Sequence, residues 1–123
     1  MKNLSFLVLS SLLFLNACYY DIEEDLYPEP EGSTCNTEDV SFSATVVPIL
    51  QTNCYVCHAA DVALGGIILE GHSEVLKVAN DGRLFGAISH NLGFSPMPQG
   101  APQLLECDIQ QIGAWIDAGA LDD

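Results

Sequence analysis

The chain has 123 residues, of which 49% are hydrophobic, and it carries 17 Asp and Glu against 3 Lys and Arg, a formal net charge of -14 at pH 7. This length allows one compact domain with tails and a modest core. The charge excludes nucleic acid as a partner, because phosphate contacts require a basic face, and it favours basic protein surfaces as docking partners.

Residues 1–17 have the pattern of an export signal. Lys2 supplies the positive start, an apolar run too short to span a bilayer stably follows, and the small Ala17 precedes a cleavage position. The letters "LNAC" resemble a bacterial lipobox, which implies removal of residues 1–17 and lipidation of Cys18. Acyl chains would then anchor the exported protein to a bacterial membrane, on the periplasmic side or at the cell surface.

Residues 18–40 contain "YYDIEEDLYPEPEGST", which is rich in acidic residues and Pro and shows neither a helical nor a strand period. This composition is typical of a solvated spacer. We therefore expect an acidic flexible tether that leads to a folded domain at 41–121.

The first predicted helix covers residues 44–56. Phe42, Val46, Ile49 and Leu50 recur at helical spacing, and Pro48 suits the first turn of a helix better than its interior. This helix should lead directly into the cysteine motif that follows.

The letters "CYVCH" place Cys54, Cys57 and His58 within five positions. Cysteines at i and i+3 lie on one side of a helical turn, so both thiols can add to the vinyl groups on one edge of a porphyrin, and His58 can then reach the iron. A redox dithiol would require a βαβ context, and a zinc site would require a second pair of ligands at zinc-like spacing. The sequence offers neither, so the motif predicts one covalent haem c.

Residues 61–71, "DVALGGIILEG", predict an extended loop because Gly residues interrupt them. Short helices should follow in "HSEVLKVAN", with Ser73 as N-cap, and in "GRLFGAISH". We expect His72 to be a turn residue without a functional role. Arg83 is expected either to pair with a haem propionate or to be an ordinary surface residue.

The segment "GFSPMPQG" carries Met97, the only methionine left once residues 1–17 are removed. Pro96 and Pro98 fix backbone torsions and stiffen the loop, which a weak thioether ligand requires. We expect Met97 to be the distal iron ligand. His90 is the alternative distal ligand, and its ordinary role would be a hydrogen bond in the loop or near a propionate.

The last predicted helix lies in "DIQQIGAWIDAGA" and stops at Gly119. Its apolar residues share one face, on which Trp115 should pack into the core. Either Asp108 caps this helix or its start is less well fixed. Gly113 should allow the first and last helices to approach closely.

Export places the domain in an oxidising compartment, where each of the five cysteines should have a role. Cys18 takes the lipid, and Cys54 and Cys57 belong to the motif. The remaining pair, Cys35 and Cys107, is therefore predicted to form a disulfide.

Over about residues 40–120 the chain resembles small bacterial class I c-type cytochromes, through "VVPILQTNCYVCH", "GGIIL", "GRLFGAISHNLGFSPMP" and "IGAWIDAGA". The resemblance implies an all-α class I cytochrome c fold, with about four short helices around one covalently bound haem. It also implies Cys54 and Cys57 as thioethers, His58 as the proximal ligand and Met97 as the distal ligand.

These features predict a membrane-anchored monohaem carrier of single electrons between exported redox partners, and not an enzyme. His/Met ligation leaves no open iron position for a substrate. Two alternatives stay open: a haem-containing accessory domain of a larger dehydrogenase or oxidase, and a ligand-binding or peroxidase-like haem protein. The chain without haem should fold poorly, because its own core is thin.

Overall fold

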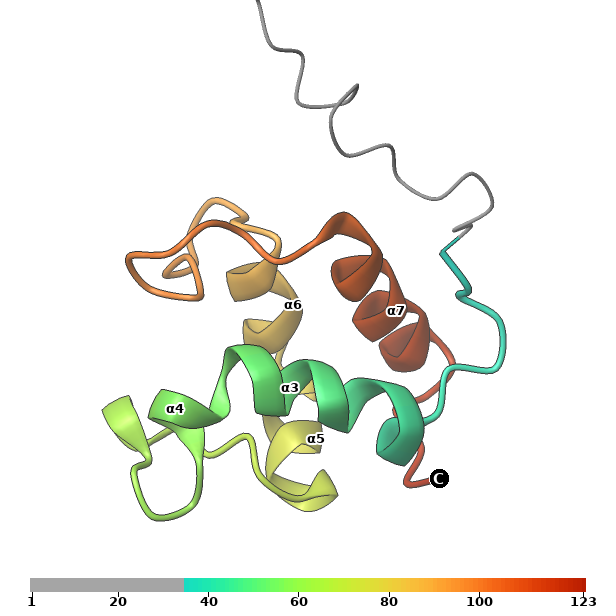
Figure 1. Ribbon diagram of the computed structural model, residues 1–123, viewed down its shortest axis with the longest axis horizontal. Coiled ribbons are helices and arrows are strands. Elements are labelled where there is room, and N and C mark those ends of the chain that lie inside the picture. The colour runs from blue at the N-terminus through green and yellow to red at the C-terminus, as the bar shows by residue number, and fades with distance from the viewer. Residues whose placement is uncertain (1–34) are drawn as a thin grey trace, which may run out of the picture. The chain divides into compact units, whose positions relative to one another are not determined.

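The structure is a computed structural model that describes residues 35–123. The elements in chain order are a π-helical turn η2 (Phe42–Val46), α3 (Val47–Asn53), α4 (Tyr55–His58), a 3-10 turn η3 (Leu64–Gly66), α5 (His72–Asn80), α6 (Arg83–Ile88) and α7 (Glu106–Asp117) (Figure 1). These residues contain no strand, so the predicted all-α class is confirmed for this part of the chain.

The predictions for residues 1–34 lie outside the described part of the chain. They concern the export signal, lipidation of Cys18 and most of the acidic tether. Within residues 35–123, no helix has the length and apolar character needed to cross a bilayer.

The predicted helix at 44–56 begins two residues earlier and is divided into η2, α3 and α4. Pro48 lies in the first turn of α3, as expected. The main-chain N–H of Phe42 donates to Asp123 Oδ1 (2.8 Å), and the N–H of Ser43 donates to the main-chain oxygen of Asp123 (2.8 Å). Ser41 is the N-cap of η2 and its Oγ accepts the N–H of Ala44 (3.3 Å), while the distant Asp123 accepts two further N–H groups that have no partner within the helix.

We expect replacement of Asp123 with alanine to lower the free energy of unfolding by about 1 kcal/mol, the usual cost of losing a helix cap. Urea unfolding measures this loss. Asp117→Ala is the matched control, because Asp117 is an exposed acid in the last turn of α7 and caps no helix N-terminus. Equal unfolding midpoints for the two variants would show that Asp123 does not stabilise η2.

The starts of α5 and α7 differ from the sequence predictions. Ser73 is not the N-cap of α5, which begins at His72 after Gly71 (φ +86°) without a side-chain cap. Asp108 does not cap α7 either, since α7 begins at Glu106 and Asp108 lies within its first turn. Acidic side chains there still interact favourably with the helix dipole. Gly119 (φ +103°) follows the end of α7, as predicted.

His72 is half-buried against two core aromatic residues and is not a simple turn residue. Its ring centroid lies 4.9 Å from that of Phe42 and 6.1 Å from that of Trp115, and its Nε2 lies 2.8 Å from the carbonyl oxygen of Ala120. Trp115 is 1% exposed, as expected for a core residue, and its indole N–H donates to Leu121 O (2.9 Å). This cluster joins η2, α5 and α7 to the C-terminal residues.

Gly113 of α7 faces α6 rather than the first helix. A Cβ at Gly113 would lie 2.9 Å from Cε2 of Phe85, so the absence of a side chain lets the Phe85 ring approach α7. The expectation of a close approach at Gly113 thus holds, but for a different partner helix.

Cys35 and Cys107 lie together as the predicted disulfide requires, with an S–S distance of 2.07 Å and Cα atoms 5.4 Å apart. The bond joins the segment before η2 to the first turn of α7 across a sequence separation of 72 residues. It therefore closes most of the described chain into one covalent loop.

Candidate functional site

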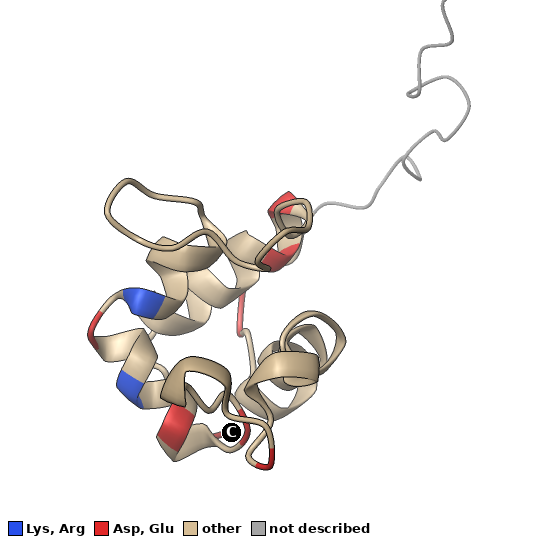
Figure 2. Cartoon of the chain, turned by 90° about the vertical axis from the view of Figure 1, so that its left-hand side faces the viewer, with Lys and Arg blue, Asp and Glu red and all other residues tan. Residues whose placement is uncertain are grey.

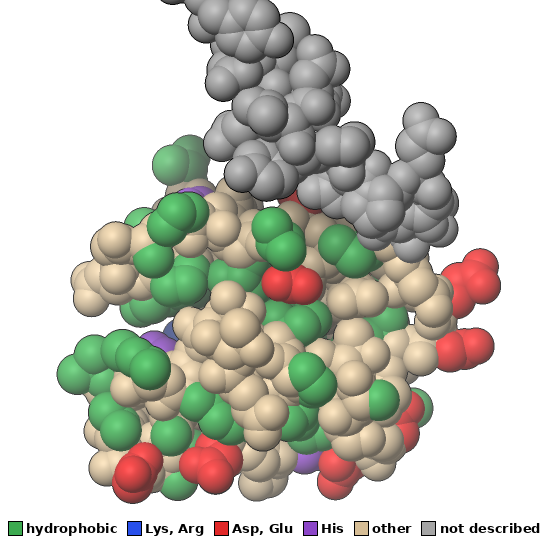
Figure 3. Space-filling model, viewed as in Figure 1, with side chains coloured by type: hydrophobic (Ala, Val, Ile, Leu, Met, Phe, Trp, Pro, Cys, Tyr) green, Lys and Arg blue, Asp and Glu red, His purple; other side chains and the backbone are tan. Residues whose placement is uncertain are grey.

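A cavity of about 800 Å³ lies between two walls of the domain. One wall comes from the end of α3, α4 and the following loop, and the other comes from α6 and the loop at 93–101. Figure 3 shows it as a hollow at the left of the domain, with hydrophobic side chains on both walls. Such a volume and lining are typical of cofactor sites.

Cys54, Cys57 and His58 all line this cavity from the same wall. Cys54 (φ -127°, ψ -33°) divides α3 from α4, and its carbonyl accepts the N–H groups of Cys57 (3.1 Å) and His58 (2.9 Å). One tight turn therefore holds the three residues together. Both cysteines are half-buried and make no disulfide.

The His58 ring is oriented by the loop that follows it. Its Nδ1 lies 3.2 Å from the carbonyl oxygen of Ile67, and the main-chain N–H of Leu69 donates to His58 O (2.8 Å). A carbonyl can only accept, so Nδ1 carries the hydrogen in this bond and Nε2 keeps its lone pair. A histidine with a free Nε2 lone pair can serve as a metal ligand.

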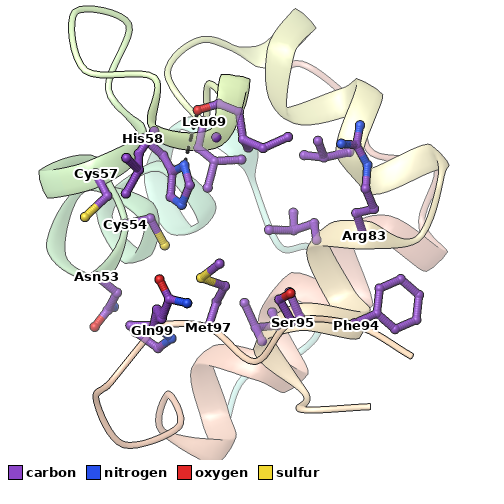
Figure 4. Close-up of a pocket in the computed structure, with 18 of the residues that line it drawn as sticks. Asn53, Cys54, Cys57, His58, Leu69, Arg83, Phe94, Ser95, Met97 and Gln99 are labelled. Atoms are coloured by element: carbon purple, nitrogen blue, oxygen red, sulfur yellow. Dashed lines mark hydrogen bonds between the residues drawn. The ribbon is translucent and has the colours of Figure 1, made fainter. Parts of the chain in front are cut away.

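Met97 lines the cavity from the opposite wall. Figure 4 shows the His58 ring and the Met97 side chain on opposite sides of the cavity and directed toward each other. The main-chain N–H of Met97 donates to Ala87 O (3.0 Å), which ties the loop to α6. The structure thus brings together the four residues predicted as a site.

His90, the alternative distal ligand, is exposed and does not line the cavity. Its Nε2 lies 3.1 Å from the carbonyl oxygen of Met97. The placement agrees with the ordinary role expected for His90, a hydrogen bond within the loop. Sequence reasoning did not identify which main-chain group it would contact.

Arg83 is the only Lys, Arg, Asp or Glu among the described residues that line the cavity. Its Nε and NH2 atoms each lie 2.8 Å from Asp81 Oδ2, and these bonds hold the pKa of the Asp81 carboxyl below its usual range. Lys77 and Arg83, the two basic residues in the part of the chain that the structure describes, lie on one side of the view in Figure 2. Because only Arg83 brings a positive charge to the cavity lining, an anionic group of a ligand in the cavity would pair with Arg83.

Burial raises the pKa of the Cys54 thiol to about 11, with a second contribution from nearby Cys57. Redox-active dithiols depend on a cysteine whose pKa is lowered, so this environment disfavours the redox reading of the motif. Within residues 35–123 no group of three or more His, Cys, Asp and Glu side chains is placed to hold a metal ion. A zinc site normally has at least three such protein ligands.

Three polar contacts of the site were not predicted from the sequence. They are the Ile67 carbonyl that orients His58 and the amide side chains of Asn53 and Gln99, which line the cavity. Asn53 adjoins the motif and was visible as a neighbour in sequence. Ile67 lies in the loop after η3 and Gln99 in the loop between α6 and α7, and the sequence does not indicate how these loops are placed at the cavity.

Comparisons with protein-family models, curated proteins and solved structures found no match to this chain.

Proposed function

We propose that the protein is a monohaem c-type cytochrome that carries single electrons, with a class I cytochrome c fold. One observation carries this proposal: Cys54, Cys57 and His58 meet Met97 across a single apolar cavity of about 800 Å³. The haem would supply an iron couple that changes by one electron.

The residues of the cavity fit a haem in volume and in chemistry. Each thiol of the motif would add across one vinyl group, with the sulfur bonding to one carbon and the hydrogen moving to the other. His58 would offer its Nε2 and Met97 its thioether to the two faces of the iron. The apolar lining would exclude water, which keeps reorganisation small between the two oxidation states.

The carrier reading is favoured over the ligand-binding or peroxidase-like alternative by the position of His90. An enzyme of that kind needs an open iron position with a histidine or another polar group above it, and His90 is the histidine nearest to Met97 in the sequence. Its ring contacts the Met97 carbonyl and lies outside the cavity lining. An accessory haem domain of a larger dehydrogenase or oxidase uses the same site and stays the alternative.

We further propose that the protein is exported, anchored through Cys18, and docked by basic patches of its redox partners. The 17 acidic residues of the chain support this docking, and steering of this kind weakens as salt rises. Stopped-flow electron exchange with a basic and an acidic redox protein, at increasing salt, distinguishes this steering from neutral contact.

The direct test is to express the full chain in a host with cytochrome c assembly machinery and to record its intact mass and visible spectrum. We expect one covalent haem, a six-coordinate low-spin spectrum and the weak far-red sulfur-to-iron band. The double variant Cys54→Ser/Cys57→Ser should lose all covalent haem. A colourless parent protein would overturn the proposed function.

A further inference from the structure

We propose that His90 is a positioning residue for Met97, which holds the methionine loop closed through a hydrogen bond to the Met97 carbonyl. This inference rests on the proposed function, because the loop matters only if the Met97 thioether binds iron. The bond is the 3.1 Å contact between His90 Nε2 and Met97 O. Since a carbonyl only accepts, the imidazole N–H is the donor.

The backbone of His90 is shaped for this contact. His90 follows the end of α6 and has a φ of +54°, a left-handed conformation that is uncommon for residues other than glycine. It turns the chain sharply after α6, and the ring reaches across the loop to residue 97. The contact therefore spans the whole loop between α6 and Met97.

The loop has few other attachments. Residues 91–96 are all exposed, so little buried area holds them in place. Apart from the His90 contact, two main-chain bonds hold the loop: the Met97 N–H donates to Ala87 O (3.0 Å), and the Asn91 N–H donates to Gly86 O (2.9 Å). The Phe94 ring also lies over Gly86, where a Cβ would come within 2.5 Å of it.

Met97 is thus held at both of its main-chain polar groups, by Ala87 on its N–H and by His90 on its carbonyl. Loss of the His90 bond leaves the carbonyl side free, and the loop regains conformational entropy whenever the thioether leaves the iron. The open state of the loop then becomes more populated.

His72 provides a matched control at another place in the fold. Like that of His90, its Nε2 contacts a main-chain carbonyl, here that of Ala120 at 2.8 Å. This contact joins α5 to the C-terminal residues, and His72 does not line the cavity. A variant at His72 loses the same kind of bond without touching the methionine loop.

The test compares four haem-loaded proteins: the parent, His90→Ala, His90→Gln and His72→Ala. The readouts are the apparent affinity of the reduced form for carbon monoxide, the far-red sulfur-to-iron band and the exchange rate of the Met97 amide hydrogen. One neutral hydrogen bond corresponds to about a fivefold change in an equilibrium, so His90→Ala should raise the affinity and the exchange rate about fivefold.

His90→Gln keeps an N–H donor on a side chain of similar reach and should restore values close to the parent. His72→Ala should lower the unfolding midpoint and leave the carbon monoxide affinity unchanged. Equal affinities for His90→Ala and the parent would overturn the inference while the proposed function stands. Loss of six-coordinate iron in both His90 variants would also overturn it and make His90 the ligand. A colourless parent would overturn the proposed function and this inference together.

Discussion

Replacement of Met97 with alanine should turn a closed haem protein into one that binds external ligands. With the proposed ligation, carbon monoxide or cyanide would have to displace the Met97 thioether in the parent, so only the fraction with an open iron position would bind. If this fraction is about 1%, the variant, in which every iron has an open position, should bind with an apparent affinity about 100-fold higher. The far-red band should disappear, and the reduction potential should fall because methionine ligation raises it.

Ligand titration of the reduced and oxidised forms measures this change. Leu92→Ala is the matched control, because Leu92 lies in the same loop with its side chain fully exposed (101%) and does not line the cavity. It should bind carbon monoxide as the parent does. A parent that binds carbon monoxide as readily as Met97→Ala would contradict distal ligation by Met97 and favour a ligand-binding haem protein.

Removal of the disulfide by the double variant Cys35→Ala/Cys107→Ala should cause the largest loss of stability. The bond closes a loop with a sequence separation of 72 residues, and loop-closure entropy puts its contribution at about 4 kcal/mol. A domain of this size has a total stability of about 5 to 15 kcal/mol, so the loss is a large share of it.

Urea unfolding with and without reductant measures this contribution. The parent in reductant should unfold at the midpoint of the double variant, whereas reductant should not change the variant itself. The thioether links proposed at Cys54 and Cys57 resist reductant, so the haem spectrum serves as an internal control. A loss below about 1 kcal/mol would show that the unfolded chain gains little freedom when the bond is absent.

The sequence was most informative where structure depends on neighbours in the chain. The helices at α5, α6 and α7 follow from apolar periodicity and from Gly119, which ends α7. The arrangement of Cys54, Cys57 and His58 also follows from their spacing, because one turn contains all three. Local spacing therefore predicted one wall of the site.

Contacts between distant residues were harder to predict. The start of η2 has a local signal in its N-cap Ser41, but its second support, the bond from Phe42 to Asp123, joins residues 81 positions apart and could not be predicted. The half-buried position of His72 likewise depends on Phe42 and Trp115. That Met97 should face His58 was predicted from the chemistry of a thioether ligand and from the resemblance to class I c-type cytochromes, since the spacing of the two residues in the chain does not set their distance.

The place where the described chain begins affects how the cavity can be approached. In Figure 1 the segment that starts at Cys35 lies at the right of the domain, near the C-terminus, whereas α4 and the loop after α6 form the left end. The described residues before η2 thus lie away from the elements that line the cavity. The segment at 35–41 therefore does not cover the cavity, and a partner protein could contact the cavity-lining residues without displacing it.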